Sequence, residues 1–418
     1  MVTETNWTVD GDNDHNDPNR DENGHNNTGD VLDERPSGMD DQETDNDDDG
    51  EEQPFDITLA ATHSYMGPGL EAVRGREVVE AGWCGRVVVV AHHGAVFPGE
   101  TVPLLLPRAD HAVTLARALT ERAMFGLLCP DELGFASGYG ALCEVYEASA
   151  GGERSLSVKA RAVHRFRFRH MPKQPYTLHR FTGEGVEMEV EVLPELGVCP
   201  PLQHARLQSL DPRRPQLPAE LRRLEASVSP WPAFVYDMFD YTRMRQTIKE
   251  YFSTFRLEAV PSDPVALSFW VASNLQLQQR DRLALLLADG ALQRLALELR
   301  LIHTSGVLCC ASCLTDIARR EHVFAMSSDG LHSNYTNLGG FVHDVVTVSR
   351  AHNISLEGGA SHEYSWFPGY TWSIALCRLC AAHVGWRFDA MKRRLRPQQF
   401  YGLCRNQVRP APTDRSHL

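Results

Sequence analysis

Four cysteines form the clearest chemical pattern in this sequence of 418 residues. Cys310 and Cys313 are separated by two residues, and so are Cys377 and Cys380. This spacing lets both thiolates of a pair reach one ion from a tight turn, and two pairs make the tetrahedral sulfur site that structural zinc prefers. Because no ligand position stays open, we expect one Zn²⁺ ion with a structural role.

Other interpretations of these cysteines are a redox pair or four core residues. The 63 residues between the two pairs are far more than in a small zinc finger, so the metal would clamp two distant parts of one domain. Cys309 could replace Cys310 as a ligand, but the two-residue spacing favours Cys310.

Three of the seven tryptophans, Trp366, Trp372 and Trp386, fall within 21 residues around the second cysteine pair. Tryptophan is usually a core residue, so ordinary packing is one interpretation. The other is a rigid aromatic box, held by the metal and by the turn at 367–369, that suits a cation or a compact neutral group. Backbone groups at the turn could add directional hydrogen bonds.

The charge of the chain is concentrated at its N-terminal end. Residues 1–53 hold 19 Asp and Glu against two Arg, a net charge of −17, whereas the remaining residues carry +3. A segment with so many acidic and so few apolar residues is expected to be disordered. It could serve as an interaction tail or as a solubilising spacer. The nearly neutral body argues against a nucleic-acid partner, because a groove for phosphates needs clustered Lys and Arg.

No run of eighteen apolar residues is present, so we expect no membrane partner. The polar, acidic N-terminus resembles neither a secretory signal nor a transit peptide. A reducing intracellular compartment is therefore expected, in which cysteines serve as metal ligands, core residues or reactive thiols.

Residues 56–200 are expected to form a β-rich domain with one helix. Strands are predicted at 87–90, 125–129, 140–146, 157–168 and 186–193, with a turn at 97–100 and a helix from Asp110 to Phe125. Alternation around Arg165 and Arg167 predicts a strand with one wet face.

A proline-rich stretch at 200–218 marks the change to helical sequence. Helices are predicted from Trp231 to Tyr251, at 265–272, at 275–288 and at 291–302. They could form a subdomain with its own core or a docking surface for a partner.

The cysteine and tryptophan segments resemble the cereblon family, the substrate receptors of cullin–RING ubiquitin ligases, in an invertebrate-like variant. The matching segments are Leu308 to Cys313, Gly340 to His343, Ser365 to Trp372, Cys377 to Cys380, His383 to Phe388 and Pro397 to Leu403. Weaker matches cover Thr62 to Gly67, Pro98 to Leu104 and Ala291 to Leu295.

The resemblance implies an α+β multidomain protein. It implies a disordered tail at 1–55, a Lon N-terminal-like domain at 56–304, a zinc-stapled all-β thalidomide-binding (CULT) domain at 305–412 and a short tail at 413–418. The helices within about 218–304 would bind the damaged-DNA-binding adaptor of the ligase. Proteins that end in a C-terminal cyclic imide, and glutarimide small molecules, would be the ligands, in the cytoplasm and the nucleus.

The resemblance also implies which residues bind the imide. Trp366, Trp372 and Trp386 would form the cage and Phe388 its floor. The other implied ligand-binding residues are Asn337 on the covering loop and Glu363, Tyr364 and Ser365 at the turn. A cyclic imide is flat, small and neutral, so indole faces suit its CH₂ groups, while backbone atoms of 364–366 suit its N–H and carbonyl groups.

This sequence departs from its relatives at the expected rim of the cage. Tyr364 stands where vertebrate relatives carry His, Leu338-Gly339 replaces a Pro-His pair, and Ile374 replaces a Val found in some relatives. Because backbone atoms would make the imide bonds, these departures concern drug-induced recruitment of second proteins more than imide binding.

Two other functions compete with an imide receptor. The zinc domain is similar in fold to methionine sulfoxide reductases, with Cys404 where a reductase thiol could lie, but nothing identifies a resolving partner. An aromatic cage beside Glu363 could instead read methylated lysine. Since no Gly-Lys-Ser/Thr phosphate loop or other catalytic motif is present, we expect a protein that is not an enzyme.

Overall fold

The computed structural model describes residues 51–411 except for 75–76, 107–112, 152–154, 172–175, 182–184, 198–207, 229–231, 256, 258 and 303–305. The acidic tail before residue 51, the C-terminal tail from 413 and Trp231 therefore lie outside the described residues. All described residues belong to one unit, Asp48–Leu418.

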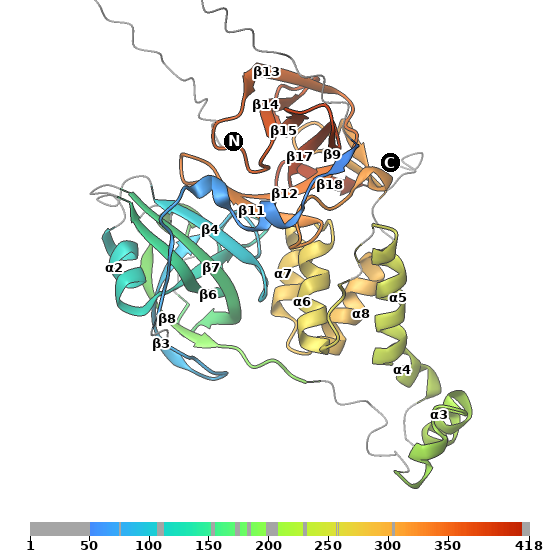
Figure 1. Ribbon diagram of the computed structural model, residues 1–418. Coiled ribbons are helices and arrows are strands. Elements are labelled where there is room, and N and C mark those ends of the chain that lie inside the picture. The colour runs from blue at the N-terminus through green and yellow to red at the C-terminus, as the bar shows by residue number, and fades with distance from the viewer. Residues whose placement is uncertain are drawn as a thin grey trace, which may run out of the picture. The chain divides into compact units, whose positions relative to one another are not determined.

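The N-terminal domain is built on a seven-stranded sheet (Figure 1). Its strands are β2 (Glu71–Ala72), β3 (Cys84–Ala91), β4 (Thr101–Leu106), β5 (Met124–Pro130), β6 (Ala136–Gly151), β7 (Ser155–Phe168) and β8 (Val186–Val192). They follow the order β2-β6-β5-β3-β8-β7-β4, and an additional pairing of β6 with β7 closes five strands into a ring. Buried apolar clusters around Phe125 and Phe166 form its core.

The strands predicted in this domain are confirmed, but the helix is shorter than expected. Helix α2 spans Val113–Arg122, and residues 107–112 lie outside the described part. The helix cannot run on to Phe125 because Ala123 adopts a left-handed conformation with φ 52°, after which Met124 begins β5.

The prediction of a wet face at Arg165 is wrong. Its side chain is fully buried, with Nε 2.6 Å from Glu195 Oε1 and Nη1 donating to the carbonyl of Leu286 at 2.6 Å. Arg294 from the helical region reaches the same carboxylate at 3.0 Å. The wet face predicted for this strand is present at Arg167, whose side chain is exposed, but at Arg165 the helices cover it. The buried charge of Arg165 persists there because it is paired.

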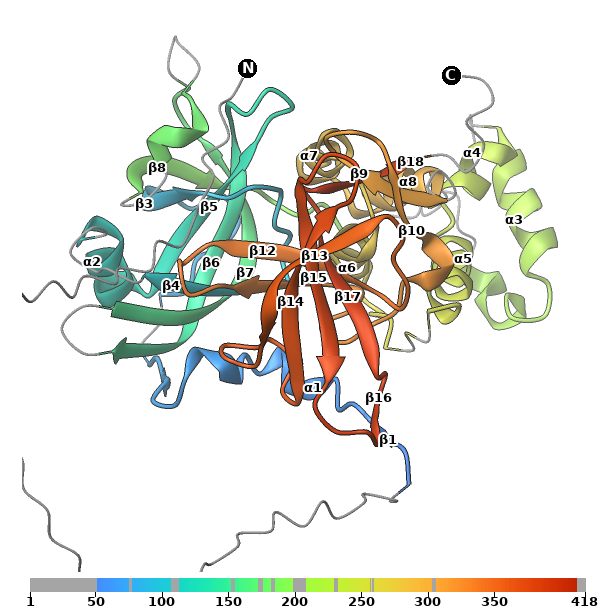
Figure 2. The same ribbon diagram turned by 90° about the horizontal axis from the view of Figure 1, so that it is seen from above.

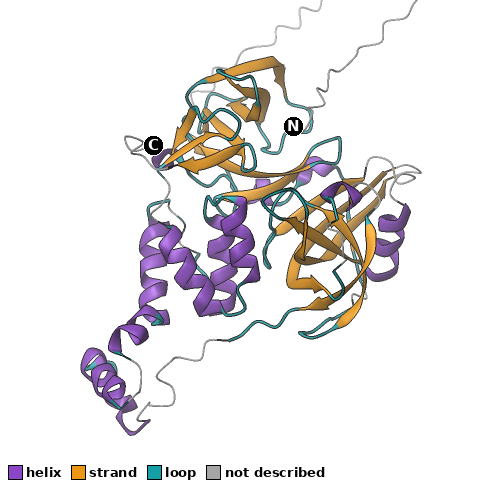
Figure 3. Cartoon of the chain, turned by 180° about the vertical axis from the view of Figure 1, so that it is seen from behind, coloured by secondary structure: helices purple, strands orange, loops and turns teal. Residues whose placement is uncertain are grey.

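Six α-helices follow the sheet among the described residues (Figure 3). They are α3 (Pro218–Ser227), α4 (Ala233–Met238), α5 (Tyr241–Ser253), α6 (Pro264–Asn274), α7 (Gln279–Leu287) and α8 (Ala291–Leu301). The single helix predicted up to Tyr251 is divided at Asp240, whose carboxylate accepts from the backbone N–H of Thr242 at 3.0 Å and so caps α5. The helix predicted from Leu275 begins only at Gln279.

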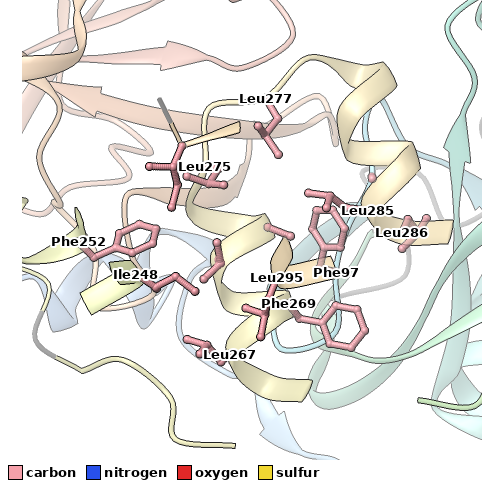
Figure 4. Close-up of a cluster of buried hydrophobic side chains, with 14 of the residues drawn as sticks. Phe97, Ile248, Phe252, Leu267, Phe269, Leu275, Leu277, Leu285, Leu286 and Leu295 are labelled. Carbon is pink, nitrogen blue, oxygen red and sulfur yellow. The ribbon is translucent and has the colours of Figure 1, made fainter. Parts of the chain in front are cut away.

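The helices share a core with the N-terminal domain (Figure 4). Phe252, Leu285 and Leu295 pack in one buried cluster that also contains Phe97, from the loop after β3. Leu275 and Leu277 extend this cluster from the connection between α6 and α7. Burial of these side chains stabilises the helical region against the sheet.

The C-terminal domain is all-β and contains two sheets (Figure 2). Its strands are β9 (Val307–Cys310), β10 (Asp316–Arg319), β11 (His332–Thr336), β12 (Val342–Val348), β13 (Ile354–Ser361), β14 (Tyr370–Cys377), β15 (His383–Ala390), β16 (Leu395–Arg396), β17 (Gln399–Cys404) and β18 (Val408–Ala411). The small sheet has the order β10-β9-β18 and the large sheet the order β11-β12-β17-β15-β14-β13.

An N-terminal arm, residues 51–66, runs along the C-terminal domain. Its elements are β1 (Gln53–Pro54), α1 (Thr58–Ala61) and a 3-10 turn at Ser64–Met66, and β1 pairs in parallel with β16. Phe55 packs edge-on against Phe367 and Tyr370. The other 3-10 turns are Leu178–Phe181, Gln208–Arg213 and Arg320–His322. Within the described part of the chain, no helix is both long and apolar enough to cross a bilayer.

Candidate metal centre and aromatic site

The four predicted cysteine ligands meet at one point. The Sγ atoms of Cys310, Cys313, Cys377 and Cys380 all lie within 4.8 Å of one another. Cys310 is 3.7 Å from Cys380 and Cys313 is 3.5 Å from Cys377, sulfur to sulfur. Tetrahedral zinc with bonds of about 2.3 Å sets its sulfurs about 3.8 Å apart, so the residues fit one structural Zn²⁺ ion.

The two cysteine pairs have the same backbone geometry. In the first, Leu314 N–H donates to the Cys310 carbonyl at 3.0 Å, and Cys310 N–H donates to the Thr315 carbonyl at 2.8 Å. The second repeats both bonds, from Ala381 to Cys377 and from Cys377 to Ala382, each at 2.8 Å. Leu314 and Ala381 both adopt left-handed backbone, with φ of 66° and 58°. This backbone conformation is strained for residues other than glycine, and here it lets each turn direct two thiolates toward the metal position.

The neighbours of the cysteines explain which thiols bind metal. Thr315 Oγ1 lies 3.1 Å from Cys313 Sγ, and hydrogen bonds from Thr315 lower the pKa of Cys313 to about 6, which favours the thiolate a metal requires. Cys309 instead directs its thiol to Asp316 Oδ1 at 3.3 Å. The structure therefore assigns the ligand position to Cys310.

The metal site joins the two sheets of the C-terminal domain. Cys310 ends β9 in the small sheet, whereas Cys377 ends β14 in the large sheet. Buried Leu308, Val384 and Leu403 belong to the apolar cluster around these strands. A zinc ion here would hold together two layers whose shared core is small, which is the role of a structural metal.

Strand register brings several expected ligand-binding residues to one face of the large sheet. Trp372 lies opposite Phe388, and Ile374 lies opposite Trp386, on the paired strands β14 and β15. Opposite residues in an antiparallel pair, and residues two apart on one strand, share a face. Phe388 is buried beneath this face and stacks on Phe400, with ring centroids 5.0 Å apart.

Trp366 reaches the same region from the loop before β14. Its ring lies edge to face with that of Trp386, with centroids 4.6 Å apart, and 6.3 Å from that of Phe388. Its Nε1–H donates to the carbonyl of Thr336 at 3.0 Å, and the indole of Trp372 donates to the carbonyl of Glu363 at 2.8 Å. Both N–H groups therefore hold the loops in place, and one face of the buried Trp366 ring stacks on Tyr335 with centroids 5.1 Å apart.

The loop of 362–369 carries the remaining expected residues. Tyr364 adopts left-handed backbone with φ 54°, which a bulky side chain rarely does. Ser365 Oγ donates to the carbonyl of Phe367 at 3.2 Å, and buried Phe367 anchors the loop in the core. The Glu363 side chain is exposed, while its backbone carbonyl accepts from Trp372 and its backbone N–H donates to Ser361 Oγ at 3.2 Å.

Asn337 organises the turn between β11 and β12. Its Oδ1 accepts from Phe341 N–H at 3.0 Å, its backbone N–H donates to the Phe341 carbonyl at 3.1 Å, and its Nδ2 lies 3.3 Å from His343 Nε2. The His343 ring lies 5.0 Å from that of Trp386 and 5.9 Å from that of Trp366, centroid to centroid. The covering turn is thus linked to the tryptophans through His343.

Sequence reasoning missed His343 and Tyr65 as parts of this site. Tyr65 belongs to the N-terminal arm, and its hydroxyl accepts from Thr336 N–H at 3.1 Å. Its ring meets that of Tyr364 edge-on with centroids 5.0 Å apart. No local pattern relates residue 65 to residues beyond 330, so only the fold brings them together.

The reductase alternative finds little support in the geometry of Cys404. Its thiol is buried, 3.9 Å from His343 Nδ1, and burial raises its pKa well above the ordinary value. A catalytic cysteine needs the opposite shift and exposure to its substrate.

Two family models match the chain. Residues 86–304 match the ATP-dependent protease La (LON) substrate-binding domain. Residues 306–416 match a family described as Yippee zinc-binding/DNA-binding/Mis18, centromere assembly. The first supports a Lon N-terminal-like domain, and the second agrees with the four-cysteine metal centre.

Curated relatives cover most of the chain. Protein cereblon of Xenopus tropicalis is 32% identical over 385 residues, which are 85% of this chain and 85% of the relative. Protein cereblon of Drosophila grimshawi is 30% identical over 369 residues, which are 86% of this chain but 55% of that relative. This chain thus spans most of the frog protein and just over half of the fly protein.

One similar solved structure is the Lon N-terminal domain protein from Xanthomonas campestris. It covers 52% of this chain and 98% of its own, with 18% sequence identity and a TM-score of 0.29. A score of this size does not establish a common fold, so the assignment of the Lon-like domain rests on the family model.

Proposed function

The chain belongs to the cereblon family, and from this premise we propose that it is the substrate receptor of a cullin–RING ubiquitin ligase. In this role the protein binds a target and presents it for ubiquitination without catalysing the transfer itself. The high pKa and burial of Cys404 support a role without thiol chemistry.

We further propose that the aromatic site binds a C-terminal cyclic imide or a glutarimide. The observation that carries this proposal is the corner formed by Trp366 and Trp386 above buried Phe388. Flat aromatic walls bury the CH₂ groups of a small ring, and backbone atoms of 364–366 offer partners for an imide N–H and its carbonyls.

A neutral ligand fits the charges around this corner better than a cation does. Glu363, the carboxylate nearest in sequence, is exposed. Burial lowers the pKa of His343 to about 4, so this neighbour of both indoles is neutral at pH 7. Trimethyl-lysine cages add a negative charge to their aromatic walls, and the described neighbours of these indoles supply none in contact with them.

The zinc ion would support this site rather than react in it. When bound, it supplies four metal–sulfur bonds that fasten β14 to the small sheet. Cys377, its ligand, and Trp372 lie on the same strand, so the metal holds the strand from which one aromatic wall projects.

The adaptor of the ligase would dock on helices α3 and α4. Four apolar side chains at or near α3 and α4 are between 45% and 66% exposed: Leu224, Val228, Phe234 and Met238. Apolar groups gathered on neighbouring short helices are typical of a partner surface. We propose the damaged-DNA-binding adaptor as that partner, and the cytoplasm and nucleus as the location.

Two experiments test this function. Co-purification from cell extract should recover a ubiquitin-ligase adaptor with the wild-type chain but not with a Phe234→Asp variant. Titration with a glutarimide should quench tryptophan fluorescence more strongly, and at lower concentration, than titration with a trimethyl-lysine peptide. Tighter binding of the ammonium peptide would overturn the choice of ligand.

A further inference from the structure

A cavity beside the aromatic corner lies where the Lon-like sheet, the helices and the zinc domain meet, and His343 contributes to both. Its volume is about 260 Å³. Four segments line it: 92–94 after β3, 277–279 with Arg282 at the start of α7, 342–344 in β12, and 405–406 after β17 together with 408–410 in β18. This is slightly below the range of roughly 300–1,000 Å³ that is usual for organic ligands.

The charge that lines the cavity is mainly positive. Arg282, Arg405 and Arg409 line it together with a single carboxylate, that of Asp344. Arg405 already occupies this carboxylate, because its Nη1 lies 3.0 Å from Asp344 Oδ2. Burial lowers the pKa of both His92 and His343 to about 4, so these two histidines in the wall are neutral at pH 7.

Arg282 is the most informative residue of the wall. Its side chain is only 2% exposed, and its Nη2 donates to the carbonyl of Ala95. Its Nε and Nη1 have no hydrogen-bond partner among the described residues. The carboxylates within ion-pair range, Asp344 at 3.6 Å and Glu100 at 3.9 Å, both lie on the side of Nη2. The guanidinium is thus ion-paired on one side, while two of its buried nitrogens remain free to donate to a further acceptor.

The N-terminus of α7 adds a second attraction for an anion at the same place. Gln278 and Gln279, which begin this nine-residue helix, line the cavity. Within the described structure, no side chain caps this end. Backbone N–H groups of the first turn, and the helix dipole, favour a negative group there.

We propose that this cavity, named here the interdomain cavity, binds a small oxyanion such as a phosphate or carboxylate group carried by a small metabolite. Arg282, Arg409 and the start of α7 would hold the oxyanion, and Arg405 would hold Asp344 aside. Because the lining comes from all three parts of the chain, the bound anion would stabilise their packing. The proposal does not depend on the function of the aromatic site.

The first test is a titration of the full-length zinc-loaded chain with inorganic phosphate. Calorimetry measures the binding, and thermal unfolding measures its effect on stability. The melting temperature should rise with phosphate concentration and saturate, as expected for a ligand that binds the native state. Citrate serves as the carboxylate probe, and sodium chloride at equal ionic strength is the control. Tighter binding of citrate would identify a carboxylate site, and the reverse order a phosphate site.

Variants then locate the binding. Arg409→Gln removes an exposed charge at the cavity and should weaken binding roughly threefold, whereas Arg350→Gln removes an exposed charge of the same domain outside it and should leave affinity unchanged. Arg282→Lys keeps the charge but loses the guanidinium geometry, so a roughly tenfold loss is expected. Binding that resists both cavity variants, or stabilisation by chloride alone, would refute the proposal.

Discussion

The rings of Trp366 and Trp386 meet edge to face, with centroids 4.6 Å apart and planes inclined by 73°. Trp366 comes from the loop before the second cysteine pair and Trp386 from the strand after it, so two of the four cysteines of the metal centre lie between them in the chain. Trp366 is buried and Trp386 half-buried, so the two perpendicular indoles form a corner at the edge of an aromatic core.

Replacement of Trp386 should abolish imide binding while the domain stays folded. This indole is half-buried and forms one wall of the corner, so Trp386→Ala should reduce glutarimide affinity roughly a hundredfold or more. Fluorescence or calorimetric titration measures the loss, and near-UV circular dichroism checks the fold. Trp83→Ala, in the Lon-like domain, is the control and should bind normally; equal loss in both variants would contradict the assignment.

Replacement of a zinc ligand should unfold the C-terminal domain. Cys377→Ser removes a sulfur from the cluster, and structural zinc contributes about 10 kcal/mol or more to metal-dependent folds. The neighbouring thiol of Cys309 points to Asp316 instead, so Cys309→Ser should keep one zinc ion per chain. Metal analysis and thermal unfolding of both variants test this. A native melt with full zinc content in Cys377→Ser would exclude the proposed ligand set.

The N-terminal arm should loosen when Tyr65 loses its hydroxyl. In Tyr65→Phe the buried N–H of Thr336 is left without this acceptor at 3.1 Å, which should destabilise the contact by about 1–3 kcal/mol. Faster hydrogen exchange in residues 51–66 measures the effect. Tyr241→Phe, whose hydroxyl donates to Ser262 in the helical region, is the control and should leave exchange in the arm unchanged. Unchanged exchange in Tyr65→Phe would show that the hydroxyl does not hold the arm.

Stability should fall as the pH is lowered from about 6.5 toward 4. Burial lowers the pKa of His343 from 6.5 to about 4, and that of His63 to about 3. The unfolded chain therefore binds more protons over this interval, so the free energy of unfolding rises with pH there. His343→Gln should reduce the slope of the free energy of unfolding against pH, measured by urea unfolding between pH 4.5 and 6.5. The reduction should correspond to the uptake of at most about one proton. The exposed His170→Gln variant should keep the wild-type slope.

Loss of the Glu195 charge should destabilise the junction between the Lon-like sheet and the helices. Arg165 and Arg294 both pair with this carboxylate and are fully buried, so Glu195→Gln leaves two buried cations poorly compensated. A loss of about 3–5 kcal/mol is expected from urea unfolding. Glu189→Gln breaks an exposed pair with Arg169 and should cost less than about 1 kcal/mol. Similar losses in both variants would show that burial does not set the effect.

The sequence by itself determined the features that depend on near neighbours. Two Cys-x-x-Cys pairs define a metal site wherever the fold brings them together. The alternating and helical patterns of apolar residues located β3, β5, β6, β7 and β8 and the helices from 233 onward. These signals are local because thiolate spacing and side-chain periodicity are set by a few residues of backbone.

The tertiary structure alone decided what depends on residues far apart in the chain. Arg165 reads as a wet-face residue until Glu195, Arg294 and the helices cover it. Spacing favours Cys310 over Cys309 as a metal ligand, and the contact of the Cys309 thiol with Asp316 decides the choice. Tyr65 reaches Tyr364, and Arg282 lies beside Asp344, through long-range packing. Burial, pairing and cavities arise from such packing, so no window of neighbouring residues contains them.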